Sequence, residues 1–169
     1  MNRLIAAIAT IGLALPTPLL AEVDQKVSAK CSEEIFNVNQ EMEKQYKVRV
    51  SQPYQAAAAH PMNPFPDSDE RWFAMITNYN DENPYVKRAA FNAENLMNSK
   101  GIQLRLASRV FQSCPSTSII GFGFQRSGYW IKYFRMPSGQ VREGIDLGCG
   151  RESAISPSTT LQWGYYQTC

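Results

Sequence analysis

The sequence predicts an α+β fold, with N-terminal helices packed on a C-terminal antiparallel β-meander and disulfides stabilising the arrangement. Three observations predict it. Apolar residues recur every three or four positions through most of the chain before Cys114, a spacing typical of amphipathic helices. After Cys114 they alternate every second position, which is typical of strands, and the chain has four cysteines. Helices followed by consecutive strands form an α+β domain.

The N-terminus predicts export. An uncharged, mostly apolar stretch covers residues 4–15, two prolines follow, and a small residue, Ala21, precedes the first acid. These are the parts of a secretory signal peptide, so we expect residues 1–21 to be removed and the mature protein to be secreted or periplasmic. The alternative is an uncleaved anchor, because residues 4–21 are as long as a membrane span. The two prolines favour cleavage, after which no stable membrane insertion is expected.

Residues 22–169 have the length of a single α+β domain. An even number of cysteines in an exported chain predicts disulfides. Three pairings are possible, and we favour the one that ties the N-terminal helix to the centre and the chain end to the sheet. It joins Cys31 to Cys114 and Cys149 to Cys169. The chain has one histidine and no C-x-x-C pair, so no metal site is expected.

The first predicted helix runs from near Ser32 to Gln45. Ser32 is a suitable N-cap and is followed by two acids, which favour a helix N-terminus. An earlier start, through Val23 and Val27, is left open. The alternating residues 47–50 predict a short strand. The apolar stripe of this helix consists of Ile35, Val38, Met42 and Tyr46.

Residues 51–68 contain four prolines, which exclude regular structure over most of the segment. We expect an ordered loop with at most one helical turn, at residues 56–59. Long loops in compact domains often carry function, so this Pro-rich loop is a candidate contact segment. Beyond it, Ser68 and two acids fit the cap of a short helix, whereas residues 72–76 fit a buried strand equally well. Both alternatives stay open.

Two further helices are predicted before the strands. Pro84 starts the first, since proline is well tolerated in the first helical turn, and Gly101 ends it. The second covers residues 103–112, with Arg105 and Arg109 on its outward side.

The strands then follow in a meander. The first, at residues 118–124, is joined to the next by a Ser-Gly hairpin turn, and a Pro-Ser-Gly turn leads to a third strand at residues 141–147. A last strand is expected at residues 160–167. Gly121 and Gly123 predict that a helix or a bulky ring packs closely on the sheet. They do not predict a nucleotide-binding loop, because a hairpin and not a helix follows, and no cofactor is expected.

The C-terminal part contains three distinctive stretches: LRLASRVFQSCPS, the hairpin FGF…GYW and the ending LQWGYYQTC. In these stretches the chain resembles a family of small secreted bacterial proteins that we associate with photosynthetic bacteria. The resemblance covers residues 104–169. It implies export and structural cysteines, and it implies no activity and no site residues.

The net charge of +2 hides an uneven distribution. Residues 22–83 carry eleven acidic and six basic side chains, whereas residues 84–169 carry four acidic and ten basic ones. Two packed halves that attract each other explain this pattern, and so does a basic face for an anionic partner. The expected partner is an unknown envelope protein or an anionic glycan, and nucleic acid is not expected in an exported protein.

Catalytic chemistry has few candidates. His60, the only imidazole, lies in the Pro-rich loop, and no G-x-S-x-G serine motif accompanies it. The carboxylates of residues 67–82 include pairs of the kind that glycan hydrolases use, although such clusters are also usual at helix starts and turns. A secreted hydrolase acting on glycan or peptide substrates, through His60 or these carboxylates, is therefore the alternative to a binding function.

The favoured interpretation is an exported binding or inhibitory module without an assigned catalytic residue. Aromatic rings next to an arginine provide stacking and cation–π contacts, and such residues are common in binding hot spots. We expect Tyr129, Tyr133 and Arg135 to lie on one sheet face and to contact the partner. Trp163, near the expected disulfide at the chain end, is the fourth predicted contact residue.

Overall fold

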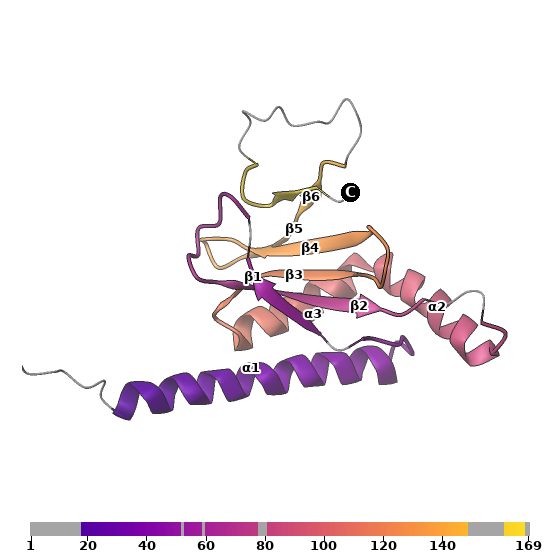
Figure 1. Cartoon of the computed structure of the whole chain (residues 1–169), viewed down its shortest axis with the longest axis horizontal. Helices are drawn as coiled ribbons and strands as arrows, with labels where there is room; N and C mark the ends of the chain where they lie inside the picture. Colours follow the sequence, from indigo (N-terminus) through magenta and orange to yellow (C-terminus); the bar gives the residue numbers. More distant parts are fainter. Residues whose placement is uncertain (1–17, 52, 59, 78–80, 149–160, 168–169) are drawn as a thin grey trace, which may run out of the picture.

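A five-stranded sheet with the order β1-β2-β3-β4-β5 forms the centre of the structure (Figure 1). The computed structural model describes residues 18–51, 53–58, 60–77, 81–148 and 161–167. Its helices and strands are, in chain order, α1 (Pro18–Lys44), β1 (Tyr54–Ala57), β2 (Asp69–Met75), α2 (Pro84–Met97), α3 (Lys100–Ser113), β3 (Thr117–Phe124), β4 (Trp130–Arg135), β5 (Val141–Glu143), β6 (Ile145–Asp146) and β7 (Tyr165–Tyr166).

The sheet combines the predicted meander with two strands from earlier in the chain. β3, β4 and β5 follow one another and pair antiparallel, which confirms the α+β fold with a C-terminal meander. β2 joins β3 in parallel, after a crossover that contains α2 and α3, and β1 pairs antiparallel with β2. The sheet is therefore mixed, with one parallel pair in an otherwise antiparallel order.

The strands β1 and β2 decide how the middle of the chain folds. Residues 72–75 lie in β2, so the strand alternative for this run is correct. The sequence allowed at most one helical turn at residues 56–59; Ala56 and Ala57 instead lie in β1, whose main chain pairs with residues 69–72 of β2, and Ala59 lies outside the described residues. The Pro-rich loop thus contributes an edge strand between its prolines.

Two other expected strands are shorter than predicted. Residues 47–50 do not form a strand, since only Val50 pairs, in a single bridge with Met75. Of the strand expected at residues 160–167, Tyr165–Tyr166 forms β7, and Thr160 lies outside the described residues.

The third strand of the meander is also shorter than the expected 141–147, because the chain changes partners at Gly144. After this glycine, β6 pairs in parallel with β7. A Cβ atom at Gly144 would lie 2.4 Å from Cε2 of Phe134 and 2.9 Å from Cδ1 of Tyr166. The absence of a side chain therefore lets the main chain cross these rings and reach β7.

The first helix, α1, begins at Pro18, so the earlier start through Val23 and Val27 that the sequence left open is correct and the start near Ser32 is wrong. Ser32 lies inside the helix, where its hydroxyl donates to the carbonyl of Ser28 at 3.0 Å, so it is not an N-cap. The predicted apolar stripe packs in or against the core and consists of Ile35, Val38, Met42 and Tyr46.

The second helix begins as predicted but ends earlier. Pro84 occupies its first turn, and the side chain of Asn83 accepts a hydrogen bond from the Tyr85 amide. Gly101 does not end α2, which stops at Met97; Gly101 lies in the first turn of α3 instead.

The face of the sheet that packs on the helices holds the main core. Phe73 and Phe122 stack there with ring centroids 5.4 Å apart, and Tyr133 packs edge-on against Phe122 at 6.0 Å. Buried side chains of α1, α2 and α3 complete this core.

One buried residue of α3 is polar for a structural reason. The amide of Gln103 donates to the carbonyl oxygens of Leu96 and Met97 at 2.8 and 2.7 Å, which satisfies main-chain acceptors at the end of α2. Gln103 is fully buried, whereas its apolar neighbour Leu104 is 39% exposed. The face of α3 that is buried therefore includes Gln103 in place of Leu104, which differs from the face that the spacing of apolar residues alone predicts.

A disulfide and ion pairs connect α1 to α3. The Cys31–Cys114 bond is formed, as predicted, and Cys149 and Cys169 lie outside the described residues. Arg105 and Arg109 of α3 both pair with Glu41 of α1.

The charge of Glu41 is stabilised by these pairs. Burial would raise the pKa of Glu41, but its hydrogen bonds with Arg105 and Arg109 and their charges outweigh burial and lower the pKa. Arg109 also pairs with Glu34 at 2.7 Å. Part of the uneven charge of the chain is thus neutralised inside the molecule, between α1 and α3.

Replacing both bridged cysteines by serine, Cys31→Ser with Cys114→Ser, is expected to lower the free energy of unfolding by about 4 kcal/mol. The disulfide closes a loop with a sequence separation of 83, and long loops lose the most chain entropy when they are closed. Urea unfolding of the oxidised protein and of the double variant measures the difference. An unchanged unfolding midpoint would show that the helix contacts alone hold α1 in place.

Candidate functional site

The second face of the sheet, which we call the outer face, carries aromatic and charged side chains. It consists of Glu70 and Trp72 of β2, Gly121 and Gly123 of β3, and Trp130, Lys132 and Phe134 of β4. The register places Trp72, Gly121 and Lys132 in one row across the strands, with Gly123 and Trp130 in the next. Phe134 is fully buried against Trp163 and Tyr166, so only the part of this face around Trp72, Trp130 and Lys132 is a candidate surface for contacts with another molecule.

The two glycines of β3 accommodate the tryptophan rings, as the sequence predicted. A Cβ atom at Gly121 would lie 2.3 Å from Cε3 of Trp72, and one at Gly123 would lie 2.4 Å from Cδ2 of Trp130. The two rings meet edge to face with their centroids 4.7 Å apart. Both rings therefore approach the main chain of β3 closely, because β3 has no side chains at these two positions.

Lys132 is held between rings and carboxylates. Its ammonium lies 4.7 Å from the centroid of Trp72 and 5.3 Å from that of Tyr166. Burial lowers the pKa of Lys132, against the charges of Glu70 and Asp146, and burial also raises the pKa of Glu70. The cation–π contacts and the nearby acids give this lysine a structural role in the outer face.

The predicted contact residues do not form one exposed surface. Tyr129 is 51% exposed, and its ring stacks on Phe124 at 5.8 Å. The expectation that Tyr133 is exposed is wrong, because Tyr133 is only 1% exposed and belongs to the core under the helices. Alternation along β4 directs it to the face that the helices cover, so Tyr133 has no surface to offer a partner.

Arg135 and Trp163 are partly buried and connect segments of the chain. The indole of Trp163 donates to the carbonyl of Arg135 at 3.0 Å. The guanidinium of Arg135 donates to the carbonyl of Pro115 at 2.6 Å and lies 4.4 Å from the ring centroid of Phe65. Binding by Arg135, Trp163 and Tyr129 stays a prediction, now without the support of a shared face with Tyr133.

His60 packs in the Pro-rich loop and connects it to β7. Its Nε2 lies 2.9 Å from the carbonyl oxygen of Tyr165, and its Nδ1 accepts from the Met62 amide at 3.1 Å. These contacts define the neutral tautomer, with Nε2 as the donor. Burial lowers the pKa of His60, and the charge of Lys132 lowers it further, against hydrogen bonds to main-chain carbonyls. Both ring nitrogens are engaged by the main chain, so neither is free to act as a base.

The carboxylates of residues 67–82 are distributed over separate places. Asp69 pairs with Arg71 at 2.9 Å and accepts from Gln55 at 2.6 Å. The strand β2 separates Asp69 from the acids before α2, and its seven residues span about 20 Å at about 3.3 Å per residue. Carboxylate pairs in glycan hydrolases lie about 5–10 Å apart. Asp69 and the acids before α2 are therefore too far apart to act as the carboxylate pair of a glycan hydrolase.

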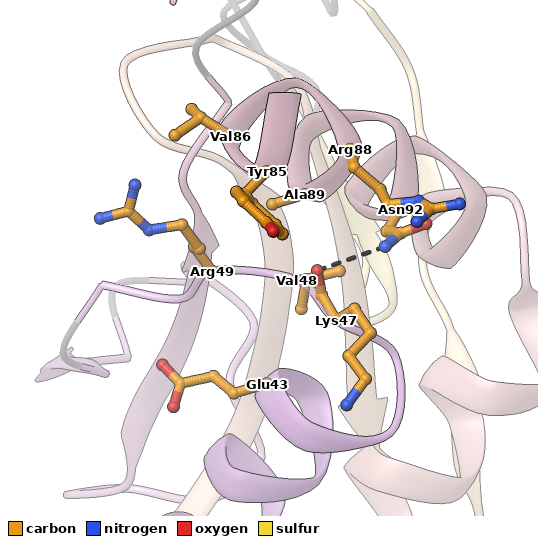
Figure 2. Close-up of a pocket in the computed structure, with 9 residues that line it drawn as sticks. All are labelled: Glu43, Lys47, Val48, Arg49, Tyr85, Val86, Arg88, Ala89 and Asn92. Carbon is orange, nitrogen blue, oxygen red and sulfur yellow. Dashed lines mark hydrogen bonds between the residues drawn. The ribbon is translucent and has the colours of Figure 1, made fainter. Parts of the chain in front are cut away.

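A pocket of about 610 Å³ lies between the end of α1 and the start of α2 (Figure 2). Its centre is apolar and is formed by Val48 and Ala89, with the ring of Tyr85 beside Ala89 and above Val48 in the view. Val48 is 2% exposed, whereas Tyr85 is 82% exposed. The full lining is Glu43, Lys47, Val48, Arg49, Tyr85, Val86, Arg88, Ala89 and Asn92.

The rim of this pocket is basic. Lys47 and Arg49 follow α1, and Arg88 projects from α2, with Glu43 as the one acid in the lining. Within the described part of the chain, none of the three cations pairs with a carboxylate. They differ in this from Arg105 and Arg109, which the acids of α1 neutralise. We call Lys47, Arg49 and Arg88 the basic rim.

The backbone at the end of α1 fixes one side of the pocket. Lys47 has a φ of 56°, a left-handed conformation that favours glycine or asparagine. Its carbonyl accepts a hydrogen bond from the side chain of Asn92 in α2 at 3.3 Å, drawn as the dashed line in Figure 2. The segment after α1 is thus held against α2, with Val48 beneath the basic rim.

The sequence analysis missed this pocket. The alternating run Lys47-Val48-Arg49-Val50 was its signal, because the apolar residues of such a run face the core and the cations face out. The alternation also fits a strand, and the two cations lie within the acidic half of the chain. Nothing in the spacing of α2 shows that Tyr85 and Arg88 lie beside it.

Metal and membrane sites are not found in the described residues. Among them, no group of three or more histidine, cysteine, aspartate or glutamate side chains is placed to hold a metal ion. None of the helices in the described ranges is both long and apolar enough to span a membrane.

Comparisons with family models, curated proteins and solved structures found no match for this chain.

Because the pKa of His60 is lowered, acidification is expected to destabilise the fold. His60 binds a proton near pH 6.5 in the unfolded chain, whereas in the folded protein it binds this proton only at a lower pH. The contribution of His60 to the free energy of unfolding is therefore complete above pH 6.5 and falls as the pH drops below this value. Chemical unfolding between pH 5.5 and 7.5 measures this, with His60→Asn as the comparison. An equally steep pH dependence in His60→Asn would exclude His60, the only histidine, as its cause.

Gly121→Ala is expected to lower the free energy of unfolding by about 1–3 kcal/mol, as overpacking does elsewhere. The new methyl group would overlap the Trp72 ring, which Trp130 and Lys132 hold in place. Gly101→Ala is the matched control, since a Cβ atom there meets nothing within 4 Å and the residue lies in a helix. Equal stability of the two variants in thermal unfolding would show that the ring moves aside at little cost.

Proposed function

We propose that the protein is a binding module that acts outside the cytoplasm, without catalysis, and recognises an anionic partner through the pocket between α1 and α2. The observation that carries the proposal is the basic rim: three cations that no described carboxylate neutralises, placed around an apolar centre. The three cations outnumber Glu43, the one acid in the lining, and a cleft with an excess of one charge attracts ligands of the opposite sign.

Export is supported by two features of the chain. The N-terminal pattern of residues 1–21 is that of a secretory leader. The Cys31–Cys114 disulfide is of the kind that forms and persists in oxidising compartments. Envelope proteins and anionic glycans are the polyanions of that environment that fit the proposal.

A binding role agrees better with the geometry than the hydrolase alternative. The nitrogens of His60 are occupied by main-chain partners. Oδ2 of Asp69 is paired with Arg71 and Gln55, and its Oδ1 is buried away from solvent. The pocket, by contrast, exposes a tyrosine ring and three cations that pair with no carboxylate of the described ranges. Aromatic and arginine side chains are the residues that most often carry binding energy in interfaces.

Replacing two cations of the basic rim by acids, Arg49→Glu with Arg88→Glu, is expected to abolish retention of the mature protein on envelope fractions of its source organism. For the unchanged protein, retention should weaken steeply between 50 and 300 mM NaCl, because exposed charges are screened by salt (roughly one Debye length of 8 Å at 0.15 M). Co-sedimentation at several salt concentrations measures both effects.

Lys87→Glu is the matched control, because Lys87 is an exposed cation of the same helix that does not line the pocket. Circular dichroism melting confirms that all variants fold. The proposal is wrong if the double variant is retained as well as the control, or if the unchanged protein does not bind the fraction at low salt.

A further inference from the structure

The arrangement of charge in the pocket differs from that of a phosphate or sulfate site. Such sites bring several donors to one point. Here the charged ends of Lys47, Arg49 and Arg88 point to three different sides of the pocket (Figure 2). A single small anion would therefore meet one cation at a time.

The space between the cations is apolar. Val48, Val86 and Ala89 line it and have no side-chain donor or acceptor, and the Tyr85 ring lies over it (Figure 2). A sugar ring can stack its C–H face on Tyr85, but the hydroxyl groups around its edge that then face Val48 and Ala89 lose their water without a new hydrogen bond. An apolar side chain loses nothing there and gains the burial.

From these two features we infer that the ligand of the pocket is an acidic polypeptide segment with a central apolar or aromatic side chain. The apolar side chain fills the centre, against Val48 and beneath Tyr85, and acids on both sides of it meet the basic rim. This inference rests on the proposed function and selects an acidic protein over an anionic glycan as the partner.

The conformation of Lys47 is consistent with a ligand contact. A left-handed backbone at φ 56° is strained for lysine and relaxed for glycine. The strain places a cation at the edge of the apolar centre. Lys47→Gly therefore removes the cation and the strain together, which gives a variant that binds more weakly without losing stability.

The contributions of the two parts can be separated. Tyr85 is 82% exposed, so Tyr85→Ala leaves the fold intact while it removes one wall of the apolar centre. Phe91→Ala is its matched control, because Phe91 is a 60% exposed ring of the same helix that does not line the pocket. Arg88→Gln and its control Lys87→Gln test the rim in the same way.

The experiment is a selection of random 12-residue peptides on the mature, oxidised protein, with counter-selection on the variant that combines Tyr85→Ala, Arg49→Gln and Arg88→Gln. The expected result is enrichment of peptides in which an apolar or aromatic residue is flanked by aspartate or glutamate. In titrations of the best peptide, Tyr85→Ala should weaken binding about ten-fold or more. Lys47→Gly and Arg88→Gln should each weaken it about two- to five-fold, with Phe91→Ala and Lys87→Gln unchanged.

An alginate octasaccharide, a polyanion without an apolar side chain, is titrated beside the best peptide. Alginate binding that equals peptide binding and that the rim variants abolish would overturn this inference while the proposed function stands. The inference and the proposed function would both be overturned if alginate does not bind and the selection yields no acidic peptides. That result means either that the enriched peptides lack acids or that no peptide prefers the unchanged protein over the variant. Peptide binding that Tyr85→Ala leaves unchanged would overturn the apolar anchor, and with it the inference.

Discussion

The packing of α1 against α3 across one face of the sheet is the constraint on which the rest of the structure depends. Val38 and Met42 of α1 are fully buried in the core that α3 and the sheet share. The Cys31–Cys114 bond fixes one point along α1, and the pairs of Glu41 with Arg105 and Arg109 fix another. Together, these contacts fix the position of the C-terminal end of α1 relative to the sheet.

The end of α1 determines the pocket. Because Val48 and Val50 are buried and Val50 bridges to Met75, the chain after α1 must run along the core with its cations outward. Asn92 then holds this segment to α2 through the carbonyl of Lys47. The positions of Lys47 and Arg49 in the basic rim thus follow from two facts: α1 is held in place, and the valines that alternate with these cations are buried. No separate loop is needed to position these two cations.

The sequence predicted those parts of the fold that local patterns determine. The meander, the apolar stripe of α1, the start of α2 at Pro84 and the Cys31–Cys114 bond are all confirmed. Each depends on spacing, on capping chemistry or on a small set of possible pairings. Gly121 and Gly123 were also interpreted correctly, because a glycine pair within a strand has few other uses.

What the sequence could not predict depends on contacts between distant segments. The parallel pairing of β2 with β3 follows from a crossover through two helices, and no local pattern encodes it. The burial of Tyr133 follows from which sheet face the helices cover, which alternation alone leaves open. The pocket brings residues 43–49 beside residues 85–92, so its cations and its apolar centre become one site only in the folded protein.

The central claim is that the pocket between α1 and α2 binds an acidic partner. Its most direct test is hydrogen–deuterium exchange of the mature protein, with and without the acidic partner or the envelope fraction that retains the protein. The account predicts added protection at residues 47–49 and 84–92, with little change in β4 and β7. Protection confined to the outer face of the sheet, around Trp72 and Trp130, with none at the pocket, would contradict it.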